Sequence, residues 1–95
     1  MNKEIRRLRT FVDFPNDYLD IRLMAKSGLY YCGEKEICKC NFCQIVIEDW
    51  SLFCNPLIEH LKFSWNCSLL RNKKTDNNPL NQKEFEKMLN TLYNY

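Results

Sequence analysis

The chain has 95 residues, enough for one domain with a thin core. Its net charge of +2 is too small to indicate nucleic-acid binding by itself, and no known groove-reading spacing occurs. No stretch has the character of a signal peptide or the length of a membrane span. We therefore expect a cytoplasmic protein, in which thiols stay reduced and clustered cysteines more often bind metal than form disulfides.

Capping and helix-breaking residues predict three short helices. The first covers residues 3–11, where apolar and basic residues have helical spacing. Asp20 can cap a second helix over residues 21–27, and Gly28 follows where a helix commonly ends in the left-handed conformation. A third helix over residues 56–63 begins with a proline, which is favoured in the first helical turn.

Strand patterns separate the second and third predicted helices. Three short runs bounded by turns have this character: residues 29–32, 37–40 and 44–48. Their short connections indicate an antiparallel meander. We therefore expect an α+β fold, in which a three-stranded antiparallel sheet is surrounded by short helices.

The chain beyond residue 70 is first polar and then amphipathic. Four apolar residues recur there with helical spacing: Phe85, Met88, Leu89 and Leu92. Such a stripe packs on its own domain or, less often, forms a surface for self-association. We divide the chain into a domain over residues 1–70, a polar linker over 71–78 and a C-terminal helix within 79–95.

Four residues have the composition and spacing of a structural zinc site. Cys40 and Cys43 can both point at one ion from a tight turn, and His60 and Cys67 complete a Cys3His set. A helix continued from His60 to Cys67 would separate them by about 10 Å along its axis. The helix must therefore end, and residues 64–66 must turn the chain back. The alternative is three unrelated thiols and an unrelated imidazole.

Further motifs surround these four residues in a fixed order. RLRTF at residues 7–11 and MAKSGLYY at residues 24–31 precede Cys40, and Trp50 and Glu59 precede His60. Together they resemble a baculovirus IAP repeat, the BIR domain of inhibitor-of-apoptosis proteins, and in particular the first repeat of viral members. The resemblance implies a small BIR fold that holds one structural Zn²⁺.

The resemblance also implies a peptide-binding groove beside the third strand. An extended peptide would add to that strand, its free amine would meet carboxylates, and its first, alanine-type side chain would enter a pocket beside a tryptophan. The positions that match this groove are Val46, Ile47, Glu48, Trp50, Cys54, Glu59 and Phe63. Such N-termini belong to processed caspases and to pro-apoptotic antagonists, so the implied role is a viral module that blocks host cell death in the host cytoplasm.

Several positions depart from the family pattern in this groove. Cys54 and Asn55 stand where carboxylates are usual, Val46 stands where strong binders often have glycine, and Leu57 replaces a common tryptophan. These changes leave Glu59 as the main charge of the amine site.

A second reading is therefore a self-associating or survivin-like structural module without a competent groove, which would bind other inhibitors or itself. Catalysis is not expected, and no catalytic residue is assigned, because the only histidine, His60, belongs to the predicted metal set.

Overall fold

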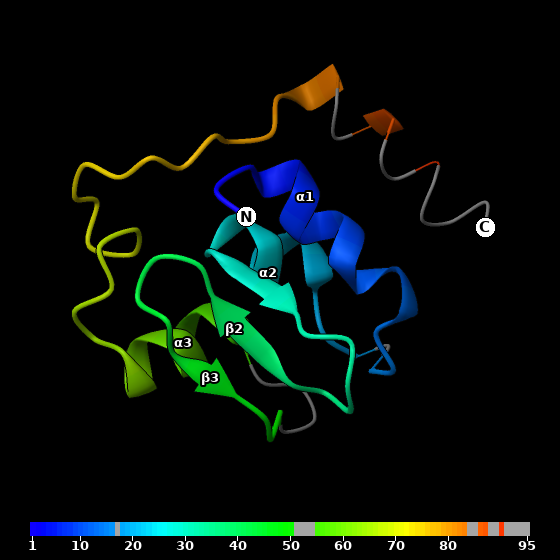
Figure 1. Ribbon diagram of the computed structural model, residues 1–95, viewed down its shortest axis with the longest axis horizontal. Helices are drawn as coiled ribbons and strands as arrows, with labels where there is room; N and C mark the ends of the chain where they lie inside the picture. Colours follow the sequence, from blue (N-terminus) through cyan, green and yellow to red (C-terminus); the bar gives the residue numbers. More distant parts are fainter. Residues whose placement is uncertain (17, 51–54, 84–85, 88–89, 91–95) are drawn as a thin grey trace.

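The structure is a computed structural model that describes residues 1–16, 18–50, 55–83, 86–87 and 90. Its helical elements are α1 (Glu4–Arg9), the 3-10 helix η1 (Thr10–Asp13), α2 (Ile21–Lys26) and α3 (Pro56–Phe63). Its strands are β1 (Leu29–Tyr31), β2 (Cys38–Cys40) and β3 (Val46–Ile47). The expected α+β fold, with a three-stranded antiparallel sheet and short helices, is confirmed (Figure 1).

Two parts of the sequence-based predictions lie outside the described residues. One is Cys54 of the predicted groove, and the other is the apolar stripe of the C-terminal helix: Phe85, Met88, Leu89 and Leu92. The described positions just before and between the stripe residues have helical backbone: Gln82, Lys83, Glu86, Lys87 and Asn90.

The N-terminal helix is shorter than predicted and continues as a 3-10 turn. The hydroxyl of Thr10 donates to the Arg7 carbonyl oxygen at 2.6 Å and accepts from the backbone N–H of Tyr31 at 2.8 Å. It thereby ties η1 to β1. The rings of Phe14 and Tyr31 meet edge to face with their centroids 5.0 Å apart, which extends this contact into the core.

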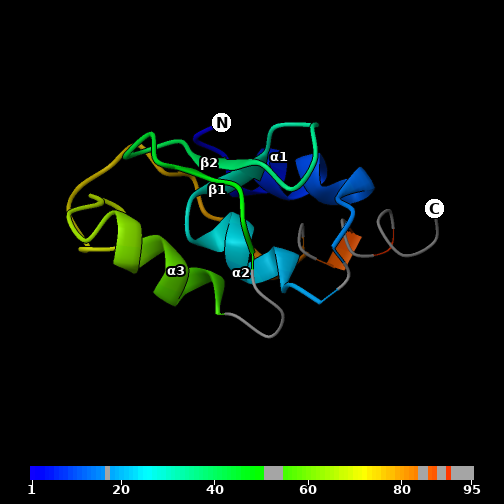
Figure 2. The ribbon, with the colours of Figure 1, turned by 90° about the horizontal axis from the view of Figure 1, so that it is seen from below.

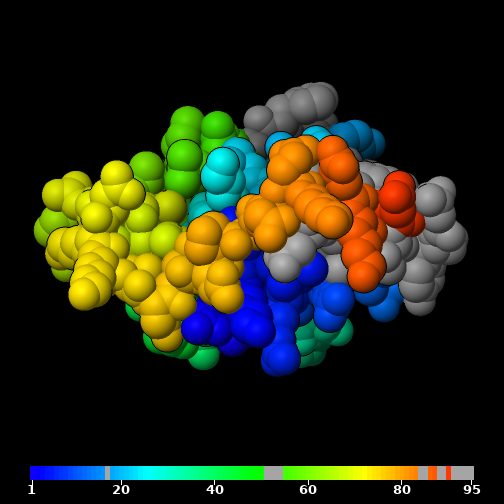
Figure 3. Space-filling model, turned by 90° about the horizontal axis from the view of Figure 1, so that it is seen from above, coloured from blue at the N-terminus to red at the C-terminus, as the bar shows by residue number. Residues whose placement is uncertain are grey.

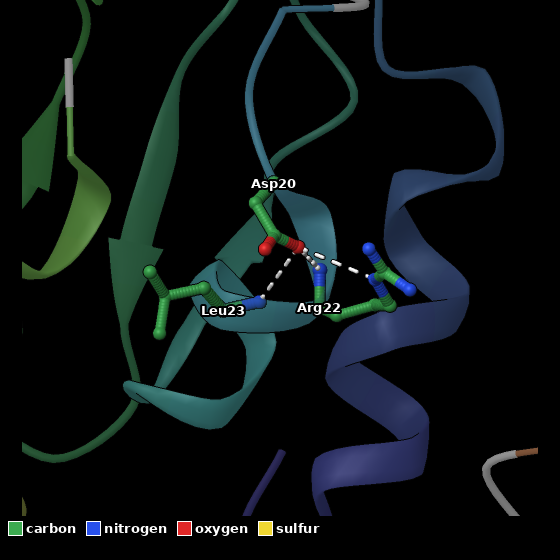
Figure 4. A network of polar contacts seen from close by, with 3 residues as sticks. All are labelled: Asp20, Arg22 and Leu23. Carbon is green, nitrogen blue, oxygen red and sulfur yellow. Dashed lines mark hydrogen bonds and ion pairs between the residues drawn. The ribbon is translucent and has the colours of Figure 1, made fainter. Parts of the chain in front are cut away.

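α2 begins where the sequence predicts and ends one residue earlier, at Lys26. The carboxylate of Asp20 accepts hydrogen bonds from the backbone N–H groups of Arg22 at 3.1 Å and Leu23 at 3.2 Å (Figure 4). These bonds satisfy two of the four N–H groups that a helix start leaves without a partner. Gly28 follows the helix with φ +96°, a conformation that side chains with a Cβ rarely adopt.

The sheet has the order β1-β2-β3, with Leu29 opposite Cys40 and Cys38 opposite Ile47. α2 and α3 lie together beneath it, as the second view shows (Figure 2). The outer side of β1 is covered by η1 through the Thr10 bond. Among the described strands, β3 is therefore the edge that remains open.

The predicted linker returns to the N-terminus. Asn78 forms a parallel bridge with Lys3, in which its N–H donates to the Asn2 carbonyl at 2.8 Å and its carbonyl accepts from Glu4 N–H at 2.9 Å. Figure 3 shows this segment lying against the N-terminal residues. The proposed domain boundaries stay a prediction, but the second half of the linker is fixed to the domain. Within the described part of the chain, no helix is long and apolar enough to cross a membrane.

Candidate metal centre and peptide groove

The four predicted ligands converge on one point. Their donor atoms all lie within 4.8 Å of one another, with 3.8 Å between the sulfurs of Cys40 and Cys67 and 3.3 Å between Cys43 Sγ and His60 Nε2. In a tetrahedral zinc site, ligand atoms are separated by about 4 Å, since each Zn–S bond is about 2.3 Å. The observed spacing therefore suits a single ion.

Local structure explains this convergence. Cys40 ends β2, and the tight turn to Cys43 closes with Gln44 at φ +66°, where its N–H donates to the Cys40 carbonyl at 3.0 Å. At the other side, α3 ends at Phe63, and the N–H of Cys67 donates to the Ser64 carbonyl at 3.0 Å. The predicted turn over residues 64–66 is therefore present.

The thiols have unequal electrostatic surroundings. Burial raises the pKa of Cys40 to about 12, although the N–H groups of Cys43 and Phe42 donate to its sulfur and oppose this change. Burial also raises the pKa of Cys43, but hydrogen bonds from the Ser64 side chain and the Ile45 backbone outweigh it, so that pKa lies below its usual value. A divalent ion bound here would displace the thiol protons, as metal binding by cysteine requires.

His60 is held as a neutral ligand. It is fully buried, and this burial lowers its pKa to about 4, against an opposing effect of the Ser27 backbone. Its Nδ1 has no hydrogen bond of ordinary geometry, whereas Nε2 faces the Cys43 sulfur. A neutral imidazole with one nitrogen directed at thiolates is the form that binds metal.

The residues fit a zinc ion. Three sulfurs and one imidazole nitrogen make a closed tetrahedral set with no position for water, which is the composition of a structural site. Cys38 is as buried as Cys40 and Cys67, but its sulfur contacts the Glu36 carbonyl at 3.7 Å and lies outside the cluster, and Cys32 is exposed. This cluster could hold a zinc ion.

The groove predicted beside the third strand corresponds to a cavity of about 290 Å³. Its lining combines backbone of the open strand edge, two carboxylates and one aromatic ring: Val46, Ile47, Glu48, Asp49 and Phe63. The structure therefore brings together four of the predicted groove residues. Asp49 also lines this cavity, although the sequence motifs did not predict it. Acidic residues that follow a strand are common on ordinary protein surfaces, so its position alone carries no signal.

The remaining predicted groove residues have different surroundings. Trp50 is only 7% exposed, and its indole N–H donates to the Glu36 carbonyl at 3.0 Å. Glu59 is half-buried on α3, one residue before the ligand His60. Asn55, which stands where the family often has a carboxylate, caps α3 by accepting from the Leu57 N–H at 2.9 Å.

With this geometry established, the comparison with known families is decisive. The family model of BIR, the Inhibitor of Apoptosis domain, matches residues 7–71. The chain belongs to the BIR family. This BIR domain contains within the matched range all four clustered ligands and the described residues of the groove.

Curated relatives of the BIR domain include viral and animal inhibitors of apoptosis. E3 ubiquitin-protein ligase IAP-3 of Orgyia pseudotsugata multicapsid polyhedrosis virus is 32% identical over 76 residues, which cover 80% of this chain and 28% of that protein. Death-associated inhibitor of apoptosis 2 of Drosophila melanogaster is 38% identical over 64 residues, which cover 67% of this chain and 13% of that protein. The chain thus spans less than a third of either relative.

Solved structures resemble the BIR domain over nearly its whole length. A crystal structure of DIAP1 BIR1 bound to a Grim peptide has a TM-score of 0.81 and 40% identity, covering 93% of this chain and 91% of that one. A crystal structure of an autoinhibited dIAP1-BIR1 domain has the same TM-score of 0.81 and 40% identity and covers 93% of each chain. The BIR fold implied by the sequence resemblance is therefore confirmed.

Proposed function

We propose that this BIR domain holds one structural Zn²⁺ through Cys40, Cys43, His60 and Cys67 and binds extended peptides with a free N-terminus along β3. The peptides would come from pro-apoptotic antagonists or processed caspases. Their capture by a viral domain in the host cytoplasm would suppress host cell death. The zinc would act structurally, by joining the turn after β2 to α3.

One observation carries the peptide proposal, namely the open edge of β3 beside a cavity. An extended peptide can pair with the free backbone groups of this edge, as in other cases of β-augmentation. Val46 and Ile47 present that edge, and Phe63 of α3 forms an apolar wall across the cavity. The Grim peptide named for the similar DIAP1 BIR1 structure supports this class of ligand.

The charges around the groove favour a cationic peptide end. Glu48 and Asp49 line the cavity, and Glu59 lies on the helix that carries its aromatic wall. A peptide ammonium group would form charge-assisted hydrogen bonds with such carboxylates, and these are stronger than bonds between neutral groups. We assign Glu59 to the amine and Glu48 and Asp49 to the adjacent part of the peptide.

Calorimetric titration tests this assignment. An Ala-first peptide is expected to bind, and the same peptide with an acetylated N-terminus is expected to lose at least about tenfold in affinity, which equals about 1.4 kcal/mol. Glu59→Gln should cause a similar loss with the free peptide. Glu34→Gln, in an exposed turn, is the matched control and should change nothing. Equal binding of free and acetylated peptides would contradict an amine site.

We propose binding rather than catalysis for this domain. His60 is the only histidine of the chain, and its Nε2 already faces the cysteine cluster. A cysteine–histidine nucleophile pair would need that imidazole as a base. The free thiols of Cys32 and Cys38 are consistent with the reducing host cytoplasm that we propose as its location.

A further inference from the structure

Arg7 is a fully buried cation on α1. Its exposed fraction is 0%, although arginine is rarely buried unless paired. Its Nε donates to the Ala25 carbonyl at 2.7 Å, and one terminal nitrogen donates to the carbonyls of Met1 at 3.0 Å and Asn2 at 3.1 Å. The other terminal nitrogen donates to Asn77 Oδ1 at 2.8 Å. The guanidinium is therefore well supplied with hydrogen-bond acceptors.

None of these acceptors carries a charge. Three are backbone carbonyls and one is a side-chain amide, and no carboxylate among the described residues forms an ion pair with Arg7. Removing an ion from water costs several kcal/mol even after relaxation, and hydrogen bonds to neutral groups leave its charge in place. A negative charge elsewhere in the interior is therefore needed to balance the guanidinium.

Phe42 contacts both this guanidinium and the cysteine cluster. Arg7 Cζ lies 5.3 Å from the centroid of the Phe42 ring, and the Phe42 N–H donates to Cys40 Sγ at 3.4 Å. A Cβ placed on Gly28 would lie 3.0 Å from Cys40 Sγ and 3.1 Å from Phe42 Cδ2, so Cys40 and Phe42 both pack closely against Gly28. The Ala25 carbonyl, which accepts from Arg7, also accepts from the Gly28 N–H at 3.2 Å.

The charge of the loaded centre has the sign that Arg7 requires. Three thiolates, one neutral imidazole and one divalent cation leave a net charge of −1. Charges separated by packed apolar groups are screened much less than charges on the surface. The electrostatics agree in direction: burial lowers the pKa of Arg7, and Glu4 and the Cys40 thiolate raise it.

We propose that Arg7 is the internal counter-cation of the metal centre, where it stabilises the three thiolates at a distance without binding the ion. This inference depends on the proposed zinc binding. It gives Arg7 an electrostatic role in addition to the bonds that hold residues 1–2 and 77 to the domain.

Metal affinity and a spectroscopic measurement together test the inference. Arg7→Gln keeps hydrogen-bonding groups but removes the charge, so Zn²⁺ affinity in competition with a chromophoric chelator should fall about 10–100-fold, as for other groups outside the ligand shell. In the Co²⁺-substituted protein, the sulfur-to-cobalt charge-transfer band should move to lower energy, because the thiolate electrons lose a nearby positive charge. Arg7→Lys retains the charge and should keep the band position and most of the affinity.

Glu4→Gln is the matched control, because Glu4 is the carboxylate that interacts electrostatically with Arg7. It should not lower zinc affinity, because removing a negative charge near Arg7 leaves the guanidinium free to act on the thiolates. Equal losses in Glu4→Gln and Arg7→Gln would show that a disturbance of α1, rather than the charge of Arg7, lowers the affinity, and would overturn the inference. The inference is also overturned if Arg7→Gln leaves the cobalt band unmoved, or if Arg7→Lys loses as much affinity as Arg7→Gln.

If Arg7→Gln does not fold even with saturating zinc, a second variant tests the same inference. Asn77→Asp retains the acceptor for Arg7 and adds a charge that compensates the guanidinium. It should lower zinc affinity and move the cobalt band to lower energy, although the contact between residues 7 and 77 becomes stronger. An unmoved band would overturn the inference. Failure of the wild-type protein to bind zinc would instead refute the proposed metal function, and the counter-cation with it.

Discussion

The sulfur of Cys43 lies 3.3 Å from Nε2 of His60, and this contact joins the turn after β2 to the middle of α3. Few side chains of that helix are fully buried. Of its residues only Pro56 and His60 are buried, while Ile58, Leu61 and Phe63 are exposed. Apolar burial of its own side chains therefore contributes little to the position of α3, and we expect the Phe63 wall of the groove to depend on the contact between Cys43 and His60.

Removal of the metal is expected to release α3 before the rest of the domain. Structural zinc contributes on the order of 10 kcal/mol to the folding of small zinc domains, and α3 lacks the buried surface to compensate for its loss. After addition of a strong chelator, amide hydrogen exchange should accelerate first over residues 56–67 and later over the rest of the domain. His60→Ala should behave like the chelated protein.

Cys38→Ala provides the control for this measurement. Cys38 is as buried as Cys40 and Cys67 but lies outside the cluster, so this variant should retain one metal ion per chain. Metal loss in Cys38→Ala, or a chelated protein with unchanged exchange at residues 56–67, would contradict the assigned ligand set.

Acid should destabilise the domain over a defined range of pH. Burial holds the pKa of His60 at about 4 in the folded protein, below its ordinary value of 6.5. Between these values the unfolded chain binds a proton that the folded chain does not, so the stabilisation is complete above pH 6.5 and is lost as the pH falls toward 4.

The chain contains one histidine, so His60 is the imidazole that titrates in this range, and Glu4, whose pKa burial raises above its ordinary 4.5, also titrates there. Thermal unfolding followed by circular dichroism should show a falling midpoint from pH 7 downward, with metal released over the same interval. A midpoint that stays constant until carboxylates titrate would exclude His60 as the group responsible.

Substitution of Gly28 should disturb the metal centre directly. Its φ of +96° strains any residue with a Cβ, and that Cβ would lie 3.0 Å from Cys40 Sγ. Gly28→Ala is expected to cost about 2–4 kcal/mol of unfolding free energy, since strain and overpacking both contribute.

Gly33→Ala separates these two contributions. Gly33 also has a positive φ, of +84°, but nothing lies within 4 Å of its Cβ position. Its substitution should cost only about 1 kcal/mol, through backbone strain, and should leave metal affinity unchanged. Equal effects of both substitutions in urea denaturation would show that contact with Cys40 is unimportant.

The sequence was sufficient for features that depend on local spacing. The Cys40-x2-Cys43 pair requires a tight turn, and the separation of His60 and Cys67 requires α3 to end between them, so the ligand set and the turn over residues 64–66 could both be predicted. The Asp20 cap of α2 could be predicted as well, because its carboxylate accepts hydrogen bonds from residues only two and three positions further along the chain.

Features that join distant segments could not be predicted in this way. Arg7 lies in a basic helix and resembles a surface residue in sequence, because its acceptors Ala25 and Asn77 are 18 and 70 residues away. The polar residues 71–78 have the composition of a free linker, yet Asn78 pairs with the N-terminus. Neither contact leaves a periodic pattern along the chain.

Trp50 has a structural role that a substitution can separate from its predicted role in the groove. Trp50→Phe keeps most of the apolar volume but removes the indole N–H that donates to the Glu36 carbonyl at 3.0 Å. The loss of this partly buried bond should lower the free energy of unfolding by about 1–3 kcal/mol. Peptide affinity should change little if the buried ring supports the groove only through its shape.

Trp65→Phe is the matched control, because Trp65 is 68% exposed whereas Trp50 is 7% exposed. Its substitution should leave the free energy of unfolding within about 0.5 kcal/mol of the wild type, as for other surface changes. Urea denaturation gives the stability of both variants, and calorimetry with the Ala-first peptide gives their affinity. A Trp50→Phe protein of wild-type stability that no longer binds peptide would assign the indole N–H to the ligand rather than to Glu36.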